Sequence, residues 1–242
     1  MKTYSFFTLF AIFLQMNRVF GQINSQTDSL AIENTISLYN QSPQARSKLY
    51  NGVEDVGYDR KIMGNPYFLT SELTTGGVDY DGKHYDNIPL LYDMVQDELV
   101  IQYYSGPIRI LLQKEKTQSF NLLNHHFIHI TPTDSLASQL KPGYYDQLYS
   151  GRLKLLARRT SSIIQVINPG NKIGQKFTSK NEYFIIKNGR SYPVSGISSA
   201  LKITDRNEGQ VKAYLKKKNL KYKSQPESVL VLIVSYQDNN PD

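Results

Sequence analysis

Hydrophobic and polar positions divide the chain into a helical beginning, a β-rich middle and a helical end. Within residues 28–39 apolar side chains recur at spacings of two to four, and no Gly or Pro interrupts them, which predicts a helix. A second short helix is expected over residues 43–50, because Ser42 is a suitable N-cap and Pro43 suits the first helical position. These two helices and a linker make up residues 22–75.

Short runs rich in Val, Ile, Leu and Tyr, separated by turn residues at regular intervals, fill residues 76–203. Asp81-Gly82 and Asn188-Gly189 are dipeptides that two-residue hairpin turns favour. Residues 168–174 are rich in Gly, Asn and Pro and are expected to form a loop. Consecutive strands with short turns predict an antiparallel meander. The expected strands are residues 78–80, 83–85, 88–92, 99–103, 108–112, 120–122, 127–130, 145–149, 153–157, 183–186 and 191–194.

Two capping-box patterns mark the end of the chain. Asp205 with Glu208, and Ser224 with Glu227, place a cap side chain and an acidic side chain where both satisfy free backbone N–H groups. They predict a C-terminal helical pair in residues 204–242, one helix over residues 206–218 and one over residues 225–236. Residues 229–234 are apolar on every side, which indicates a buried helix or a buried strand.

These patterns together predict an α+β fold. A helical N-terminal segment precedes a large antiparallel β meander, and two C-terminal helices pack on that meander. The meander is expected to curl into an open barrel or a sandwich.

The first residues have the order of a secretory signal: Lys2, the apolar run of residues 6–14 and then a polar stretch. The run is shorter than the roughly 20 residues that a membrane-spanning helix needs. Cleavage is expected after Gly21, which leaves a mature chain of 221 residues starting at Gln22. No later stretch is long enough to span a bilayer. The mature chain is therefore expected to have no transmembrane segment and to reside in the periplasm or with the outer membrane.

The chain has no cysteine, which excludes disulfides, thiolate metal ligands, a cysteine nucleophile and lipid attachment to an N-terminal cysteine. Its charge is unevenly spread: residues 22–140 have a balance of −6 and residues 141–242 a balance of +11. The split indicates either a basic face for an anionic partner or two halves of one fold that attract each other. Nucleic acid is not expected as a partner, because an exported protein rarely meets it and no nucleic-acid motif is present.

Three segments carry a resemblance to known sequences: YDGKHYDNIPLLYD (80–93), GYYDQLYSGRLKLLARR (143–159) and EYFIIKNGRSYPV (182–194). They resemble a family of uncharacterised exported proteins common in Bacteroidetes bacteria, and the resemblance covers nearly all of the mature chain. The resemblance implies that the chain is exported and, because these are turn and strand motifs, that it has the β-rich fold of that family. It brings no catalytic residue to this chain.

No catalytic residue, metal site or cofactor is predicted. His125, His126 and His129 are the histidine cluster, and one zinc ion would need their imidazoles close together. On a strand, His125 and His129 share a face but lie roughly 13 Å apart, while His126 points the other way. The cluster is therefore interpreted as turn and surface histidines.

The acidic residues Asp79, Asp81, Asp86 and Asp93 raise the question of calcium binding or of hydrolysis by paired carboxylates. An EF-hand loop aligned on Gly82 lacks the required acids, and Asp81 is explained by its turn. Glycoside hydrolysis needs two carboxylates about 5 to 9.5 Å apart, which any acidic hairpin can supply. No nucleophile elbow, phosphate-binding loop or dinucleotide fingerprint is present, so the sequence favours a protein without catalytic activity.

Two sets of residues are candidates for binding. Tyr80, Tyr85 and Tyr92 offer rings for a sugar or peptide, although tyrosine also suits strands with one wet face in the absence of any ligand. The other set is basic and lies at the end of the penultimate helix, where cations also interact with the helix dipole. It consists of Lys216, Lys217, Lys218, Lys221 and Lys223.

The expected function is that of a non-catalytic exported envelope protein, a module that binds or scaffolds an anionic envelope component or another envelope protein. One alternative is a hydrolase of an envelope polymer that uses the meander carboxylates. Another is a carrier of a small apolar ligand in a β-barrel. A cavity with convergent acids favours the hydrolase, an apolar cavity the carrier, and a filled core the scaffold.

Overall fold

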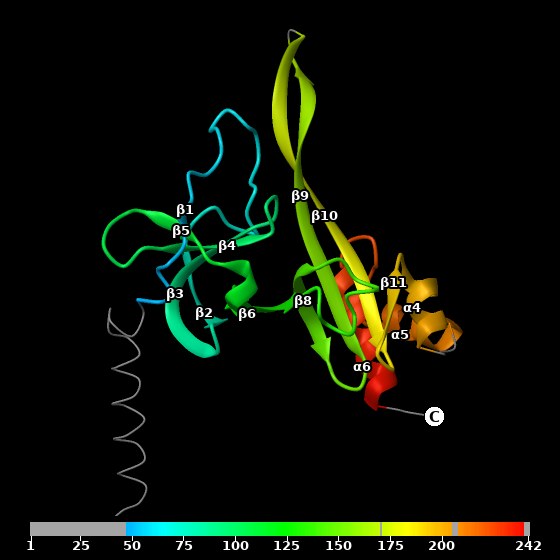
Figure 1. The fold of residues 1–242 in the computed structure, drawn as a ribbon. Coiled ribbons are helices and arrows are strands. Elements are labelled where there is room, and N and C mark those ends of the chain that lie inside the picture. Colours follow the sequence, from blue (N-terminus) through cyan, green and yellow to red (C-terminus); the bar gives the residue numbers. More distant parts are fainter. Residues whose placement is uncertain (1–46, 170, 205–207, 240–242) are drawn as a thin grey trace, which may run out of the picture. The chain divides into compact units, whose positions relative to one another are not determined.

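The computed structural model describes residues 47–169, 171–204 and 208–239 (Figure 1). The predicted signal segment, its cleavage after Gly21 and the helix predicted over residues 28–39 lie outside the described residues, as does most of the helix predicted over residues 43–50. The capping pattern that begins at Asp205 lies outside them as well. None of the described helices has the length and apolar character that crossing a membrane requires.

One antiparallel sheet contains the eleven described strands, in the order β1-β5-β4-β3-β2-β6-β7-β8-β9-β10-β11. Among these strands β1 and β11 are free edges, so the sheet does not close. The predicted large antiparallel meander is therefore confirmed in its open form. The strands are β1 (Val53–Glu54), β2 (Thr74–Tyr80), β3 (Lys83–Asp93), β4 (Glu98–Gln102), β5 (Arg109–Leu111), β6 (Thr117–Leu122), β7 (His125–Ile130), β8 (Gly143–Ser150), β9 (Lys154–Asn168), β10 (Lys172–Lys187) and β11 (Arg190–Val194).

The two predicted Asx-Gly hairpin turns are present. Asp81 and Gly82 have φ angles of 51° and 73° between β2 and β3, and Asn188 and Gly189 have φ angles of 51° and 71° between β10 and β11. Positive φ at both central residues is the signature of a type I′ turn, whose twist matches that of the flanking strands. The backbone requirement explains why these dipeptides predict the hairpins correctly.

Strands β9 and β10 are much longer than predicted, with 15 and 16 residues. Strand β8 pairs only with the start of β9, and β11 pairs only with the end of β10. Beyond these pairings β9 and β10 pair with each other and form an arm, which consists of residues 160–168 and 172–180. The prediction of a loop over residues 168–174 is wrong, because both strands continue to a short turn. Figure 1 shows the arm extending away from β8 and β11.

Three helices follow the sheet: α4 (Ile197–Ile203), α5 (Glu208–Lys217) and α6 (Pro226–Asn239). The predicted pair corresponds to α5 and α6, whereas α4 lies in the stretch that the sequence assigned to the meander. Ser199 Oγ accepts hydrogen bonds from the backbone N–H groups of Ser195 and Gly196 at the start of α4. The predicted Ser224–Glu227 capping box is wrong, because α6 begins at Pro226 and the Glu227 carboxylate binds side chains of the sheet instead.

The sheet has two main hydrophobic cores. One lies within β2 to β7 and contains stacked and edge-on aromatic rings, such as Phe120 against Phe127 with centroids 4.6 Å apart. The other lies between β8 to β11 and the helices, and it includes Val229, Leu230 and Val234 of α6, all fully covered. The apolar run over residues 229–234 is thus a buried helix. Burial of α6 on the sheet places the loop between α5 and α6, and its lysines, at the surface.

Candidate functional site

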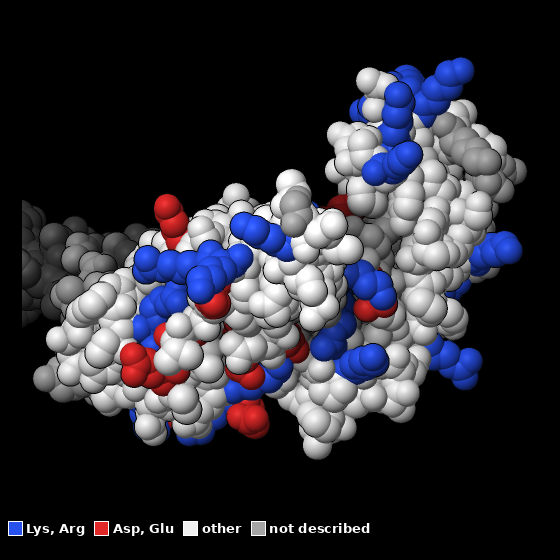
Figure 2. Space-filling model, turned by 90° about the horizontal axis from the view of Figure 1, so that it is seen from above, with Lys and Arg blue, Asp and Glu red and all other residues white. Residues whose placement is uncertain are grey.

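The five predicted lysines lie together at one end of the helical layer. Lys216 and Lys217 are in the last turn of α5, and Lys218, Lys221 and Lys223 follow in the connection to α6. All five side chains are exposed, and in the described part of the chain none of them forms an ion pair with an acid. In Figure 2 basic side chains outnumber acidic ones at the upper right, whereas both kinds mix at the left. The cluster therefore carries an uncompensated positive charge.

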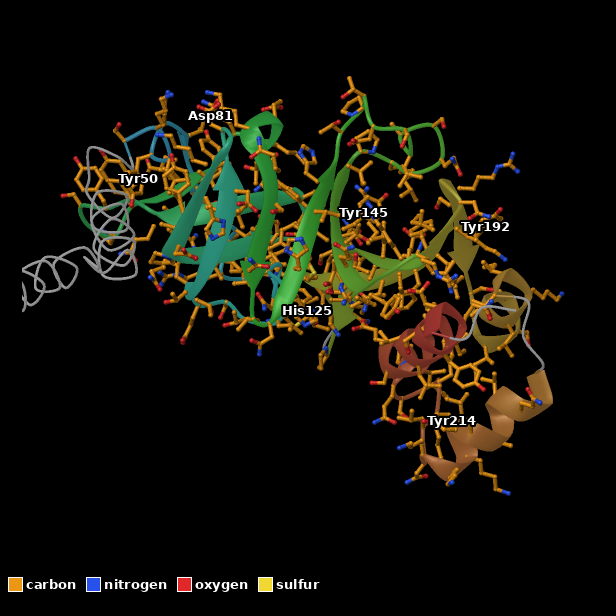
Figure 3. The ribbon with its side chains drawn as sticks, turned by 90° about the horizontal axis from the view of Figure 1, so that it is seen from below. Tyr50, Asp81, His125, Tyr145, Tyr192 and Tyr214 are labelled. Atoms are coloured by element: carbon orange, nitrogen blue, oxygen red, sulfur yellow. The ribbon has the colours of Figure 1, made fainter. Side chains whose placement is uncertain are left out.

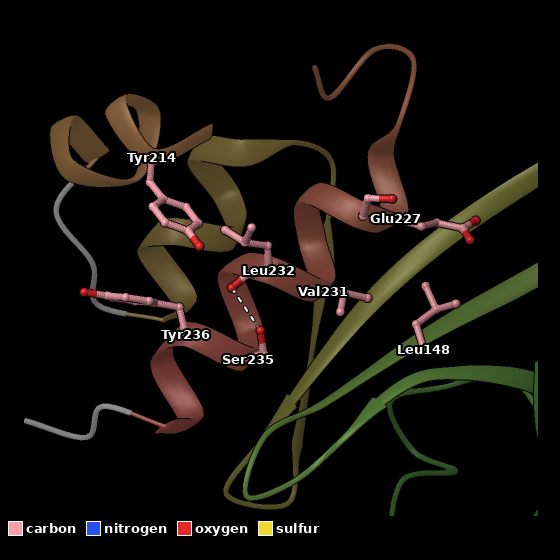
Figure 4. A pocket seen from close by; sticks show the side chains of 8 residues that line it. Leu148, Tyr214, Glu227, Val231, Leu232, Ser235 and Tyr236 are labelled. Carbon is pink, nitrogen blue, oxygen red and sulfur yellow. Dashed lines mark hydrogen bonds between the residues drawn. The ribbon is translucent and has the colours of Figure 1, made fainter. Parts of the chain in front are cut away.

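An apolar groove of about 680 Å³ adjoins this lysine cluster (Figure 4). Tyr214 of α5 and Tyr236 of α6 flank it, with 41% and 47% of their surfaces exposed. Leu232 and Val231 of α6 form its apolar lining. Lys218 links the groove to the cluster, because its Nζ lies 5.9 Å from the centroid of the Tyr214 ring. In Figure 3 nitrogen-tipped side chains surround the helix that carries Tyr214.

The tyrosines predicted to form a binding face belong to the core instead. Tyr80, Tyr85 and Tyr92 are 1%, 4% and 0% exposed and pack in the core of β2 to β7. The Tyr92 hydroxyl donates to Asp97 Oδ1 at 2.8 Å, which satisfies its polar end inside the protein. The second half of β3 is covered on both faces, so its rings cannot reach a ligand. The assignment of these three residues to binding is therefore wrong.

The meander carboxylates do not converge on one site. Asp93 is fully buried, accepts hydrogen bonds from the Tyr58 hydroxyl and the Val95 backbone N–H, and serves the β3–β4 turn. Asp81 lies in its hairpin turn, near Lys48. Asp79 and Asp86 lie at the surface of the first hairpin. None of the four lines the groove at Tyr214 or the cavity beside His125 and Arg159.

Asp79 and Asp86 instead hold His84 between them. His84 Nδ1 lies 2.6 Å from Asp79 Oδ1, and Nε2 lies 3.0 Å from Asp86 Oδ1. The hydrogen bond with Asp79 raises the pKa of the His84 imidazole, and the bond with Asp86 adds to it against a lowering by burial. Ser119 Oγ donates to the other oxygen of Asp79. The serine therefore binds the carboxylate and not the imidazole, which is not the arrangement of a catalytic triad.

The histidine cluster lies on β7, as the strand prediction requires, and each member has a different partner. His126 Nδ1 lies 2.8 Å from Asn121 Oδ1, and His129 Nδ1 donates to the Thr117 carbonyl at 3.0 Å. His125 Nδ1 donates to the buried Asp146 Oδ2 at 2.8 Å. Only His125 thus belongs to a buried network of charges.

That network links β7, β8, β9 and α6. Arg159 of β9, 4% exposed, donates through Nε and Nη2 to Asp146 of β8 and through Nη1 to Glu227 of α6. Burial is the largest single influence and raises the pKa of the Glu227 carboxyl, but the hydrogen bond and charge of Arg159 together with the Tyr183 hydrogen bond outweigh it, so the net shift is downward. Burial and the contact with Glu227 raise the pKa of the Tyr183 hydroxyl to about 12. At neutral pH the Glu227 carboxyl is therefore ionised and the Tyr183 hydroxyl is neutral.

Sequence reasoning missed Asp146, Arg159 and Glu227 as members of one site. Arg159 is 13 residues from Asp146 and 68 from Glu227, so no local spacing connects them. The available signal was weak: the pair Arg158-Arg159 follows the apolar residues 155–157 of one strand, where a buried charge needs a partner.

In its described residues, the fold and the site define an α+β protein with an open antiparallel meander, helices α4, α5 and α6 over the second half of that meander, and a basic surface on the helices. Comparisons of the chain with models of protein families, with curated proteins and with solved structures find no match.

Proposed function

We propose that this protein is a non-catalytic exported module that binds an anionic amphiphile of the cell envelope on the surface between α5 and α6. The observation that carries the proposal is the contact between the lysine cluster and the apolar groove, at Lys218 and Tyr214. One end of an amphiphile would meet cations, and the other would meet Val231, Leu232 and the two tyrosine rings.

Both halves of this surface contribute to binding in physically distinct ways. The lysines attract an anionic head group through a Coulomb interaction that salt screens over a Debye length of about 8 Å at physiological ionic strength. The groove removes apolar surface from water, which stabilises a complex by about 25 cal/mol per Å². A simple anion lacks the second contribution and a neutral lipid lacks the first, so the surface is expected to select ligands that have both.

The geometry supports the two alternative functions less well. The hydrolase would need convergent carboxylates, whereas Asp79, Asp81, Asp86 and Asp93 are distributed over separate turns and hydrogen bonds. The carrier would need a closed barrel, and the described sheet keeps two free edges.

Vesicle sedimentation tests the proposal. Replacing Lys216, Lys217 and Lys218 with Gln is expected to weaken binding to phosphatidylglycerol vesicles about 100-fold, because each lysine near an anionic surface contributes about 1 kcal/mol. The matched control replaces Lys172, Lys176 and Lys180 of the arm with Gln, which removes the same charge from another exposed region. The control is expected to bind as the parent does, and neither protein should bind phosphatidylcholine vesicles.

Two results would contradict the proposal. Equal losses in both triple variants would show that binding follows total charge and not this surface. Unchanged binding of the α5 variant would show that the lysines only interact with the helix dipole and solvent.

Export belongs to the same proposal and is supported by the order of residues 1–21. Mass spectrometry of the envelope fraction is expected to find a mature N-terminus at or near Gln22. Cytosolic protein that retains Met1 would contradict it.

A further inference from the structure

A second cavity, of about 490 Å³, lies between residues 65–69, the base of the arm and the buried charge network. Its size lies within the range of about 300 to 1,000 Å³ that is common for small-molecule sites. Arg159 and Glu227 of the network line it, as does His125. The cavity differs from the α5–α6 groove in its lining, although Glu227 reaches both.

Aromatic rings cover part of the cavity wall. Tyr67, Phe68 and Phe177 line it, and each is less than a tenth exposed. Their positions are fixed by neighbours: the Phe68 ring stands edge-on to His125 at 4.9 Å, and the Phe177 ring stands edge-on to Tyr58 at 5.1 Å. A fixed aromatic wall offers a stacking surface for the C–H face of a ring-shaped ligand.

Several polar groups at the cavity have unused hydrogen-bonding capacity. Because His125 Nδ1 is bound to Asp146, its Nε2 remains for a hydrogen bond with a ligand. Glu227 binds Arg159 and Tyr183 through Oε1, which leaves Oε2 as a second acceptor. Asn65 accepts the Tyr67 N–H through Oδ1, which leaves its NH₂ group as a donor. In the described chain no hydrogen bond engages the side chains of Ser179 and Asn181 of β10, which can both donate and accept.

This set of groups distinguishes between classes of ligand. An anion finds no available cation, because all three nitrogens of the Arg159 guanidinium already bind carboxylates. A ligand without polar groups would leave His125 Nε2 and Glu227 Oε2 unpaired. Hydroxyl groups both donate and accept, so they match the mixture of acceptors and donors at this wall.

The backbone at the cavity supports the same interpretation. Leu69 lines the cavity with a φ of 56° and a 69% exposed side chain. A leucine in the left-handed region is strained, and such residues cluster at ligand sites. Its exposed side chain adds an apolar surface next to the aromatic wall.

We propose that this cavity binds a neutral, polyhydroxylated ligand of one or two sugar units. The sugar ring packs against the cavity wall to which Tyr67, Phe177 and the exposed Leu69 contribute. Its hydroxyls form hydrogen bonds with His125 Nε2, donate to Glu227 Oε2 and accept from the Asn65 and Asn181 amides. This proposal does not depend on the binding of an amphiphile at the α5–α6 groove.

Saturation-transfer NMR with the full mature chain tests the inference, with glucose, N-acetylglucosamine and maltose as separate probes. At least one sugar is expected to receive saturation from the parent protein. The double variant Ser179→Ala/Asn181→Ala should weaken that binding about tenfold, the effect of removing two neutral hydrogen bonds. The control Ser162→Ala/Thr178→Ala changes a cross-strand pair on the other face of the same arm and should bind as the parent does.

Three results would overturn the inference. The first is absence of transfer to all three sugars. The second is a result in which methylammonium, added as a further probe, receives saturation and none of the sugars does. That would assign the cavity to a cation held by the aromatic rings and Glu227. The third is equal weakening in both double variants, which would show that the sugars contact the arm without entering the cavity.

Discussion

At the scale of single residues, Arg159 shows how the fold accommodates charge in its interior. Its guanidinium is 4% exposed and donates to two carboxylates from different elements. Removing two or three charges from water is costly, and the cost is offset only when every group finds good partners. The network therefore fixes β8, β9 and α6 relative to one another, and it holds His125 and Glu227 at the cavity.

Replacement of Arg159 by Met is expected to lower the free energy of unfolding by about 3 to 5 kcal/mol, because Asp146 would remain buried without its cation. Chemical denaturation measures the change. Arg190→Met, at an exposed position of β11, is the matched control and should change stability by less than about 0.5 kcal/mol. A loss below about 1 kcal/mol at Arg159 would show that the network contributes little to stability.

Glu98 gives the chain a pH dependence of known sign. Burial raises the pKa of its carboxyl from 4.5 to about 7, with Lys114 opposing this shift and Asp97 adding to it. The folded state thus holds the proton more tightly than the unfolded chain. Below pH 4.5 the carboxyl is protonated in both states and does not oppose folding. As the pH rises through about 7 the buried carboxyl must ionise, so the free energy of unfolding falls.

Glu98→Gln removes this titration, so the variant is expected to melt at a higher temperature than the parent at about pH 8 and at the same temperature at about pH 4. Thermal unfolding followed by circular dichroism measures both. Glu54→Gln, at an exposed carboxyl of β1, should follow the parent throughout. A Glu98 variant that gains nothing at the higher pH would refute the assigned shift.

Single residues were also where the sequence was least informative about the candidate site. The lysines of α5 were predicted as a group because they are neighbours in sequence. The tyrosines of β2 and β3 were misassigned, since alternation does not show whether the second face of a strand is covered. Glu227 was assigned to a helix cap because it follows Ser224 by three residues, and its partner Arg159 was missed because it lies 68 residues away.

At the scale of elements, the hairpin turns are specified by local chemistry. Gly189 has a φ of 71° and open space where a Cβ would stand, whereas Gly196 has an extended φ of 171° and equally open space. The two positions therefore differ in backbone conformation and not in crowding.

Gly189→Ala is expected to lower the free energy of unfolding by about 1 to 2 kcal/mol, the cost of left-handed backbone for a residue with a Cβ. Gly196→Ala should be neutral or slightly stabilising, because alanine restricts the unfolded chain. Urea denaturation of both variants provides the comparison. Equal effects at the two positions would contradict the assignment of a type I′ turn to residues 188–189.

The arm and α4 show why other elements could not be predicted. Gly, Asn and Pro at residues 168–174 signal a turn but do not show how far the strands extend toward it. Opposite residues of the arm share a face, and exposed Ile167 and Ile173 pair there without a core to cover them. A strand with one buried face shows alternating apolar and polar residues. An arm exposed on both faces lacks this alternation, so the sequence does not reveal its length. Helix α4 is only seven residues long, too short for a clear helical period.

At the scale of the whole molecule, the uneven charge has a structural basis. In the described sheet many acidic residues are bound within the first hairpins and turns, as Asp55, Asp79 and Asp93 illustrate. The lysines of the helical end have no such partners in the described chain. The charge of the lysine cluster is therefore not neutralised within the described chain, which is the basis of the proposal that this cluster binds an anionic ligand.

A fluorescent reporter tests that claim most directly, because the chain contains no tryptophan. Tyr214→Trp places a single indole in the groove, and Tyr104→Trp places one at an exposed site, 57% accessible, between β4 and β5. With phosphatidylglycerol vesicles at low salt, the emission of the indole at position 214 is expected to shift to shorter wavelength, and high salt should reverse the shift. The indole at position 104 should not respond. A shift at both positions, no shift at either, or a shift at position 214 that survives replacement of Lys216, Lys217 and Lys218 by Gln would contradict the account.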